Sequence, residues 1–222
     1  MQSCEVFANE IDLAQSADPK LLALMHLPPE NSLSNLLSKK DYLRLDKILK
    51  NINGPSIEMF ENIIPMQTMG ALSNQVLGAE NHEVLDFALY NIATELQLEK
   101  TGLETLEDHM IVLKTIDIDE QIKMLKAVIR NFRSYKKLTI KMLDLYLEGN
   151  VQKIYKIGRK NVRKFNKVLL LNRNIIMKDS FLTISRDQRL FAAIGAGHLG
   201  GKNGLLRLLK KHGKKVTPIL LP

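Results

Sequence analysis

The residue best placed for chemistry is a histidine that stands among glycines at the end of an apolar segment. The segment is Phe191-Ala-Ala-Ile-Gly-Ala-Gly-His198-Leu-Gly-Gly201. Glycines leave the backbone around His198 uncovered, which close approach of a ligand or a metal ion requires. Ligands of open α/β sheets bind at the carboxyl ends of the strands. The pattern therefore predicts a functional His198, with Gly195 and Gly197 in contact with substrate.

The same glycines also match the dinucleotide fingerprint G-x-G-x-x-G, through Gly195, Gly197 and Gly200. That fingerprint requires an acidic residue about 20 positions further on, which binds the ribose, and further βαβ units. The following segment, Val216-Thr-Pro-Ile-Leu-Leu-Pro222, contains no acid, so we do not expect a dinucleotide. A plainer alternative stays open, in which the glycines only form a tight turn and His198 has no chemical role.

A carboxylate ends a second compact segment. Gly102-Leu103-Glu104 is typical of a short buried strand, and Thr105 follows it as the expected cap of a helix. A carboxylate at a strand end is a candidate metal ligand or general base. An equal alternative is that Glu104 only helps to cap this helix.

Few strands and many helices have to position these residues. Apolar patterning predicts strands at 6–13, at 102–104, from residue 191 and at 216–220. It predicts helices at about 32–50, from 56 with an interruption at Pro65, at 82–94, from 105, and at 117–132, 137–148, 162–180 and 203–212, with a loop at 72–80. We therefore expect one domain over residues 1–222, an α/β fold whose mixed sheet core carries a large helical insertion at about 30–95 and 117–180.

Composition excludes several classes of protein. The 222 residues are enough for one sizeable core, and 45% hydrophobic and 25% charged residues are ordinary for a globular protein. No run of 18 or more apolar residues is present, so we expect no transmembrane segment. The single cysteine, Cys4, excludes an internal disulfide and a multi-cysteine zinc site.

The first ten residues lack the basic and apolar regions of a signal peptide, which favours the cytoplasm. An expected strand nevertheless begins almost at the first residue, and this predicts that an N-terminal strand is missing. A leader in such a missing segment would make the protein periplasmic or surface-exported. The sequence carries no signal for an oligomeric state.

The net charge of +8 is concentrated in one part of the chain. Residues 123–167 contain fourteen Lys or Arg and two acids. Such a segment could attract nucleic acid or an anionic membrane surface. Its aromatic residues fall at helical spacing, which is typical of a core, so we regard nucleic-acid binding as the weaker interpretation. They are Phe132, Tyr135, Tyr146, Tyr155 and Phe165.

Four segments, in this order, resemble the TraB/GumN/Tiki family, also written TraB/PrgY/GumN. They are Asn9-Glu10-Ile11-Asp12, Gly102-Leu103-Glu104-Thr105, Arg173-Asn174 and the glycine-rich block that contains His198, continued by Gly213-Lys-Lys-Val216. The resemblance covers nearly the whole chain. It implies a fold similar to the erythromycin-esterase-like and ChaN-like proteins.

For the animal Tiki members, the activity that the resemblance implies is metal-dependent peptide hydrolysis, with manganese or cobalt as the ion and zinc as an alternative. In that family two G-x-x-H motifs supply histidines to one site. Gly195-Ala-Gly-His198 matches the second, and this sequence has no first motif upstream. One histidine with scattered carboxylates makes a poor transition-metal site. Either a missing segment supplies the first motif, or the chain is a variant that no longer cleaves.

The resemblance also implies roles for single residues. His198 would ligate the metal, and Glu10 or Glu104 would supply an oxygen ligand or act as base toward water. Arg173 would pair with a carboxylate or stabilise an oxyanion, and Asn174 would orient it. The plain alternatives are a surface cation and a solvated amide. The remaining histidines are expected to be structural or on the surface: His26, His82, His109 and His212.

Three functions remain at this point. The preferred prediction is a metal-dependent hydrolase that acts on a peptide or small-molecule substrate. The second is a non-catalytic protein on the same fold that binds a peptide or a signal molecule, as the peptide-pheromone control linked to PrgY- and TraB-type members suggests. The third is a basic protein that binds nucleic acid or a membrane surface through residues 123–167.

Overall fold

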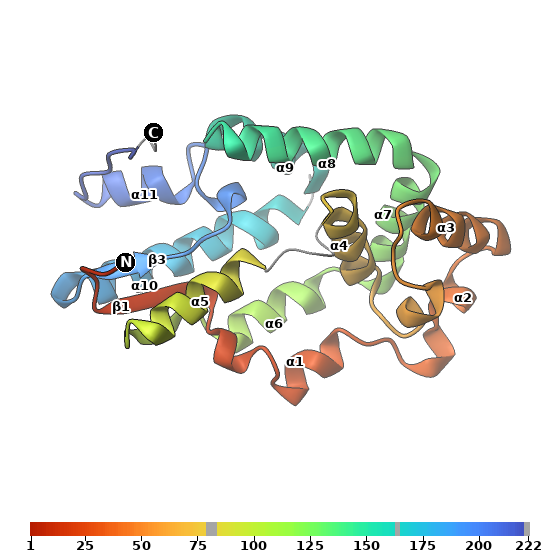
Figure 1. Ribbon diagram of the computed structural model, residues 1–222, viewed down its shortest axis with the longest axis horizontal. Coiled ribbons are helices and arrows are strands. Elements are labelled where there is room, and N and C mark those ends of the chain that lie inside the picture. The colour runs from red at the N-terminus through yellow and green to blue at the C-terminus, as the bar shows by residue number, and fades with distance from the viewer. Residues whose placement is uncertain (79–83, 163–164, 220–222) are drawn as a thin grey trace. The chain divides into compact units, whose positions relative to one another are not determined.

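The computed structural model describes residues 1–78, 84–162 and 165–219. These residues form a small parallel sheet and many helices (Figure 1). They divide into two compact units. The first unit consists of Met1–Ser16, Leu85–Val112 and Leu145–Pro222, and the second of Ala17–Val84 and Leu113–Asp144. The α/β class is confirmed, while the single domain stays a prediction.

The first unit contains a three-stranded sheet in the order β2-β1-β3, with β1 at Val6–Ile11, β2 at Glu99–Glu104 and β3 at Leu190–Ala192. Both outer strands run parallel to β1. The first four residues of β1 are buried, as expected for a central parallel strand that is covered on both faces. Because the strands are parallel, their carboxyl ends meet at one edge of the sheet.

Two expectations about this sheet were wrong for the described residues. The sheet is not mixed, because all its strands are parallel. The segment 216–219 forms no strand, and residue 220 lies outside the described part. Pro218 removes a hydrogen-bond donor there, and Ile219 is 88% exposed, so nothing buries the apolar side chains that suggested a strand.

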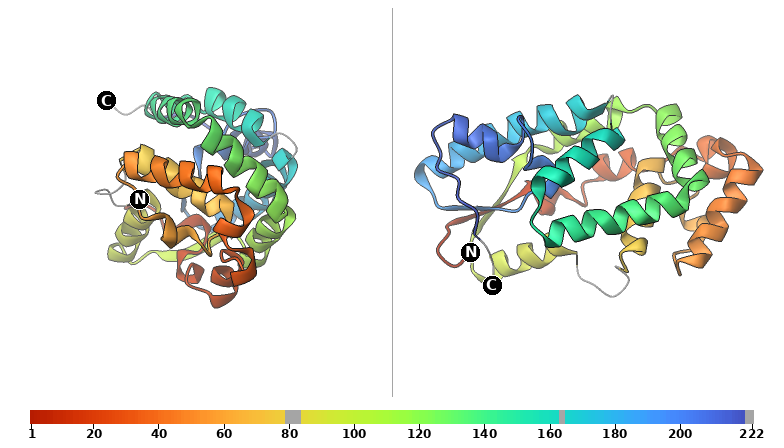
Figure 2. Two further views of the ribbon diagram at one scale, coloured as in Figure 1. Left: turned by 90° about the vertical axis from the view of Figure 1, so that its right-hand side faces the viewer. Right: turned by 90° about the horizontal axis from the view of Figure 1, so that it is seen from above.

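Helices surround the sheet of the first unit. They are α5 (Leu85–Glu95), α6 (Leu106–Thr115, with its end in the second unit), α9 (Val151–Val162), α10 (Arg173–Asp187) and α11 (Leu205–Lys211). A π-helical segment at Lys167–Asn172 leads into α10. Helices α10 and α11 pack side by side (Figure 2). One hydrophobic cluster of this unit consists of Ala8, Leu103, Met177 and Leu205, and other buried apolar residues of the unit include Phe7, Ala93 and Leu209.

The second unit is helical in its described part. Its helices are α1 (Pro19–Leu24), α2 (Leu33–Leu36), α3 (Lys39–Asn51), α4 (Pro65–Val76), α7 (Ile118–Arg130) and most of α8 (Phe132–Leu147). Its core includes Leu33, Leu45, Leu49, Leu72 and Leu125. Phe132 and Tyr135 pack against that core, as predicted for them, whereas Tyr146 is 51% exposed.

Several helix boundaries differ from the expected ones. The helix expected at 32–50 is broken before Ser38, whose hydroxyl accepts the backbone N–H of Asp41 and starts α3. Pro65 does not interrupt a helix but begins α4, because its fixed φ suits the first helical turn. That helix covers residues expected to be a loop. Helix α9 was not expected at all.

None of the described helices is both long enough and apolar enough to cross a membrane.

Candidate functional site

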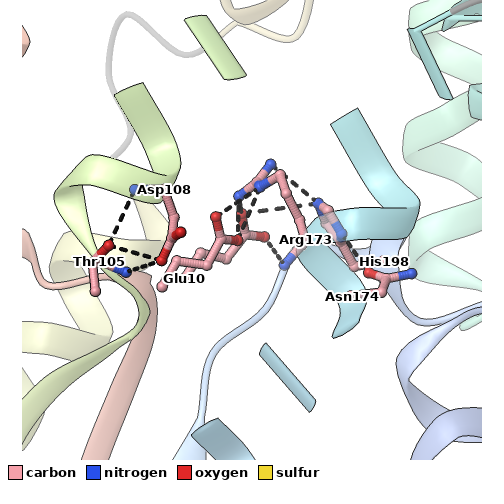
Figure 3. A network of polar contacts seen from close by, with 8 residues as sticks. Glu10, Thr105, Asp108, Arg173, Asn174 and His198 are labelled. Atoms are coloured by element: carbon pink, nitrogen blue, oxygen red, sulfur yellow. Dashed lines mark hydrogen bonds and ion pairs between the residues drawn. The ribbon is translucent and has the colours of Figure 1, made fainter. Parts of the chain in front are cut away.

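The carboxyl edge of the sheet gathers the predicted site residues. Glu10 lies near the end of β1 and Glu104 ends β2, while His198 follows β3 in a short 3₁₀ turn. Arg173 and Asn174 begin α10. Parallel strands place their ends together, so residues that are far apart in sequence form one polar network (Figure 3).

Arg173 is the centre of this network. Its Nε lies 2.9 Å and 3.0 Å from the two carboxylate oxygens of Glu104, and its Nη2 donates to Glu10 Oε2 at 2.6 Å. The side chain of Arg173 is 11% exposed and that of Glu104 is 0% exposed. The plain alternative of a surface cation is therefore wrong, and Arg173 pairs with carboxylates as the resemblance implied.

His198 is fixed by an amide on one side. Its Nδ1 lies 2.7 Å from Asn174 Oδ1, and Asn174 Nδ2 donates to the Asn203 carbonyl at 2.8 Å. Because the Asn203 carbonyl only accepts, Asn174 Oδ1 must be the acceptor for His198, and Nδ1 carries the proton. Asn174 is buried, so the alternative of a solvated amide is wrong. It orients His198 rather than Arg173.

The other ring nitrogen of His198 faces the charged groups. Its Nε2 lies 3.4 Å from Arg173 Nη1 and 4.0 Å from Glu10 Oε2. Burial lowers the pKa of His198 to about 4, and the Arg173 charge acts in the same direction while Glu10 opposes it. The ring is therefore neutral at pH 7, with a lone pair on Nε2.

The two carboxyl groups differ in their environment. Burial alone would raise the pKa of Glu10, but the charges of protonated His198 and of Arg173, with the Gly195 N–H, bring it below its ordinary value. Burial raises the pKa of Glu104 above its ordinary value, because desolvation outweighs the pull of Arg173. The helix-capping role suggested for Glu104 belongs instead to Asp108, which exchanges hydrogen bonds with Thr105.

The glycines of the predicted site have different roles. The N–H of Gly195 donates to Glu10 Oε1 at 2.7 Å, and a Cβ at Gly195 would lie 2.8 Å from that oxygen. A Cβ at Gly197 would meet nothing within 4 Å. Gly195 therefore gives room to Glu10, and substrate contact by either glycine stays a prediction.

The burial of two residues near the site was not predicted. His109 was expected to be structural or on the surface; it is half-buried, its Nδ1 has no hydrogen-bond partner among the described residues, and Arg173 and Glu10 both act on its charge. Burial is the main cause that lowers its pKa. Asn9 is 3% exposed and its Oδ1 likewise has no partner in the described structure. The sequence placed Asn9 in the family-like segment that contains Glu10, without assigning it a role. His82 lies outside the described residues.

The fit of a divalent metal to this site is partial. His198 Nε2 and Glu10 Oε2 are 4.0 Å apart, and metal–ligand distances of roughly 2.0–2.2 Å would let one ion contact both. Catalytic zinc sites take three ligands from the protein. The described residues contain no group of three His, Cys, Asp or Glu suited to a metal, and Arg173 already binds Glu10. These residues offer two ligands.

Comparisons with known proteins agree with the order of the site segments. A search of curated proteins gives no match, and neither does a search of solved structures. The model of the TraB/PrgY/gumN family matches residues 1–218, which includes every strand and all the residues of the network. By that match over nearly its whole length, the chain belongs to the TraB/PrgY/gumN family.

Proposed function

We propose that this protein is a hydrolase of the TraB/GumN/Tiki type that acts on peptides, on a fold of the erythromycin-esterase-like and ChaN-like kind. The observation that carries the proposal is the hydrogen-bond chain from the Asn203 carbonyl through Asn174 to His198. It leaves a neutral, oriented Nε2 beside a carboxylate and a guanidinium. Hydrolysis needs an acceptor for the proton of water and a cation near the oxygen that becomes negative.

The side chains divide these tasks in a simple way. His198 Nε2 and Glu10 Oε2 are acceptors that can hold and polarise a water molecule. Arg173 Nη1 faces His198 at 3.4 Å, whereas its Nε and Nη2 are bound to carboxylates, so Nη1 is the donor available to a developing oxyanion. Glu104 holds the guanidinium in place with both oxygens.

A divalent ion is the proposed cofactor, with Mn²⁺ or Co²⁺ first and Zn²⁺ as the alternative. His198 and Glu10 would be its ligands from this chain. A neutral imidazole whose other nitrogen donates to an amide oxygen is the form that binds metals. When bound, such an ion acidifies water and polarises a carbonyl.

A second function is favoured by one observation. Arg173 donates hydrogen bonds to both Glu10 and Glu104, so each carboxylate already has a partner without a substrate. A protein that only binds a peptide or signal molecule would keep such a network for rigidity. The hydrolase remains preferred because the contact of His198 Nε2 with Arg173 Nη1 is long, at 3.4 Å, and adds little rigidity to that network.

The first experiment is a calorimetric titration with Mn²⁺, Co²⁺ and Zn²⁺, combined with a peptide-hydrolysis screen. It compares the unchanged chain with His198→Ala and with His212→Ala, an exposed histidine of the same unit whose Nδ1 contacts the Leu208 carbonyl of the adjoining helix. We expect metal binding and hydrolysis that are lost in His198→Ala and retained in His212→Ala. Hydrolysis without metal binding would keep the hydrolase and reject the cofactor. Metal-supplemented protein that cleaves no peptide would contradict the hydrolase.

A further inference from the structure

A cavity of about 560 Å³ opens beside the network in the first unit. Its walls come from the ends of β1 and β3, from the start of α5 and from Tyr146. Most of the lining is apolar, and includes Ile11, Leu89 and Phe191. The volume suits a small organic molecule or one amino-acid side chain with its backbone.

The polar part of this cavity is acidic. Glu10 and Asp86 both line it, and its described lining includes no Lys, Arg or His. Asp86 lies in the first turn of α5, where a helix favours negative charge. Burial and the nearby charge of Glu10 nevertheless raise its pKa. The Asp86 carboxylate therefore stands in the cavity without a cation that would compensate it in the described structure.

A buried amide marks the same place. Asn9 lines the cavity, and its Nδ2 donates weakly to Asp86 Oδ1 at 3.5 Å. Its Oδ1 is buried and has no partner among the described residues. An unsatisfied buried acceptor costs about 1–3 kcal/mol, so a donor supplied by a ligand would be favoured at this oxygen.

We propose that this cavity binds a primary ammonium group carried on an apolar body. An ammonium has three donors and no acceptor. Asp86 and the unpartnered Oδ1 of Asn9 offer it acceptors at the polar end of the cavity, and Glu10, which also binds Arg173, adds negative charge there. The apolar walls exclude a hydrated metal ion in favour of an organic cation. The group can come from a free aliphatic amine or from the amino terminus of a peptide.

This inference concerns binding and does not depend on hydrolysis. The experiment is calorimetry with n-hexylamine, and with 1-hexanol as a neutral probe of the same length. We expect the amine to bind about tenfold more tightly than the alcohol, which corresponds to about 1.4 kcal/mol. Equal affinity for the two probes would overturn the proposal.

Two variants locate the binding. Asp86→Asn should remove most of the preference for the amine, and Asp187→Asn, an exposed acid at the end of α10, should leave it unchanged although the charge change is the same. Ala193→Leu narrows the cavity and should weaken amine and alcohol alike. A preference for the amine that survives Asp86→Asn would show that the amine binds elsewhere, and it would reject the proposed site.

The two sources of the ammonium are distinguished by a second pair of probes. The tripeptide Leu-Gly-Gly carries a free amino terminus, and its N-acetylated form does not. Binding of the free peptide alone identifies the amino terminus as a ligand. Binding of n-hexylamine with no binding of either peptide keeps the ammonium site and restricts its ligands to small amines.

Discussion

At His198, a backbone carbonyl decides which ring nitrogen faces the charged groups. The Asn203 carbonyl fixes the Asn174 amide, and the amide fixes the proton of His198 on Nδ1. The residues of this hydrogen-bond chain lie in two segments, residues 198–203 and the start of α10, so its geometry depends on few parts of the protein. Arg173 alone connects it to the carboxylates of the sheet.

The burial of His198 predicts how stability depends on pH. Its pKa is lowered to about 4 in the folded protein, below its value of about 6.5 in the unfolded chain. Between these values the unfolded state binds a proton that the folded state does not, so stability falls as pH decreases from about 6.5 to 4. The loss is at most about 1.4 kcal/mol per pH unit.

The measurement is urea unfolding at a series of pH values, for the unchanged chain and for His198→Ala. The difference between the two curves reports the titration of His198 together with its effect on Glu10, whose pKa the charge of protonated His198 lowers. We expect the unchanged chain to lose stability more steeply in this window. Parallel curves would show that protonation of His198 does not lower the free energy of unfolding.

At the scale of elements, the glycines after His198 act as a packing surface for α9. A Cβ at Gly200 would lie 2.3 Å from the Val151 carbonyl oxygen, and one at Gly201 would lie 2.2 Å from the Tyr155 ring. Gly201 also has a φ of +83°, which favours glycine. These glycines therefore serve close helix packing, whereas Gly195 gives room to Glu10.

A pair of glycine substitutions tests this arrangement. Gly204→Ala would place a Cβ 2.0 Å from the Gly200 carbonyl oxygen and should destabilise the protein by about 1–3 kcal/mol, because backbone must move. Gly158→Ala, within α9, meets nothing within 4 Å and should stabilise it by up to about 1 kcal/mol. Chemical unfolding of both variants gives the two values, and a stabilising Gly204→Ala would contradict the packing.

The sequence predicted the strands and the network better than the helix boundaries. Glu104 and His198 follow short apolar segments with strong local patterns, whereas Glu10 and Arg173 were predicted through the family resemblance. Parallel strands bring together the strand ends near which Glu10, Glu104 and His198 lie. The burial of His109 and Asn9 was missed because it depends on tertiary packing, which no local pattern reports. Helix α9 was missed because its basic residues obscured the pattern of its apolar face, on which Ile154 and Tyr155 are buried.

At the scale of the whole molecule, two separate cores stabilise the chain. The cluster of the second unit includes Leu45 and Leu125, and that of the first unit includes Ala8 and Met177. The site lies in the first unit, where the ion pairs of Arg173 join the ends of β1 and β2 to the start of α10.

The separation of the cores predicts additive substitutions. Leu45→Ala and Met177→Ala should each destabilise the protein by about 2–5 kcal/mol, since both side chains are fully buried. The two residues belong to different clusters, so the double variant should equal the sum within about 0.5 kcal/mol. Calorimetric melting of the unchanged chain, the two single variants and the double variant measures this. A larger deviation from the sum would show that the two clusters unfold as one.

The order of the strands in the sheet also matters while the chain is being made. Strand β1 is central and is synthesised first, but β3 begins only at Leu190. At about 5–20 residues per second, a ribosome needs roughly ten to forty seconds to deliver that partner. During this time the edge of β1 that later pairs with β3 has no partner strand. Val6 and Phe7, which are buried in the finished sheet, lie along that edge. A nascent chain of this kind is a natural client for chaperones that shield exposed apolar strands.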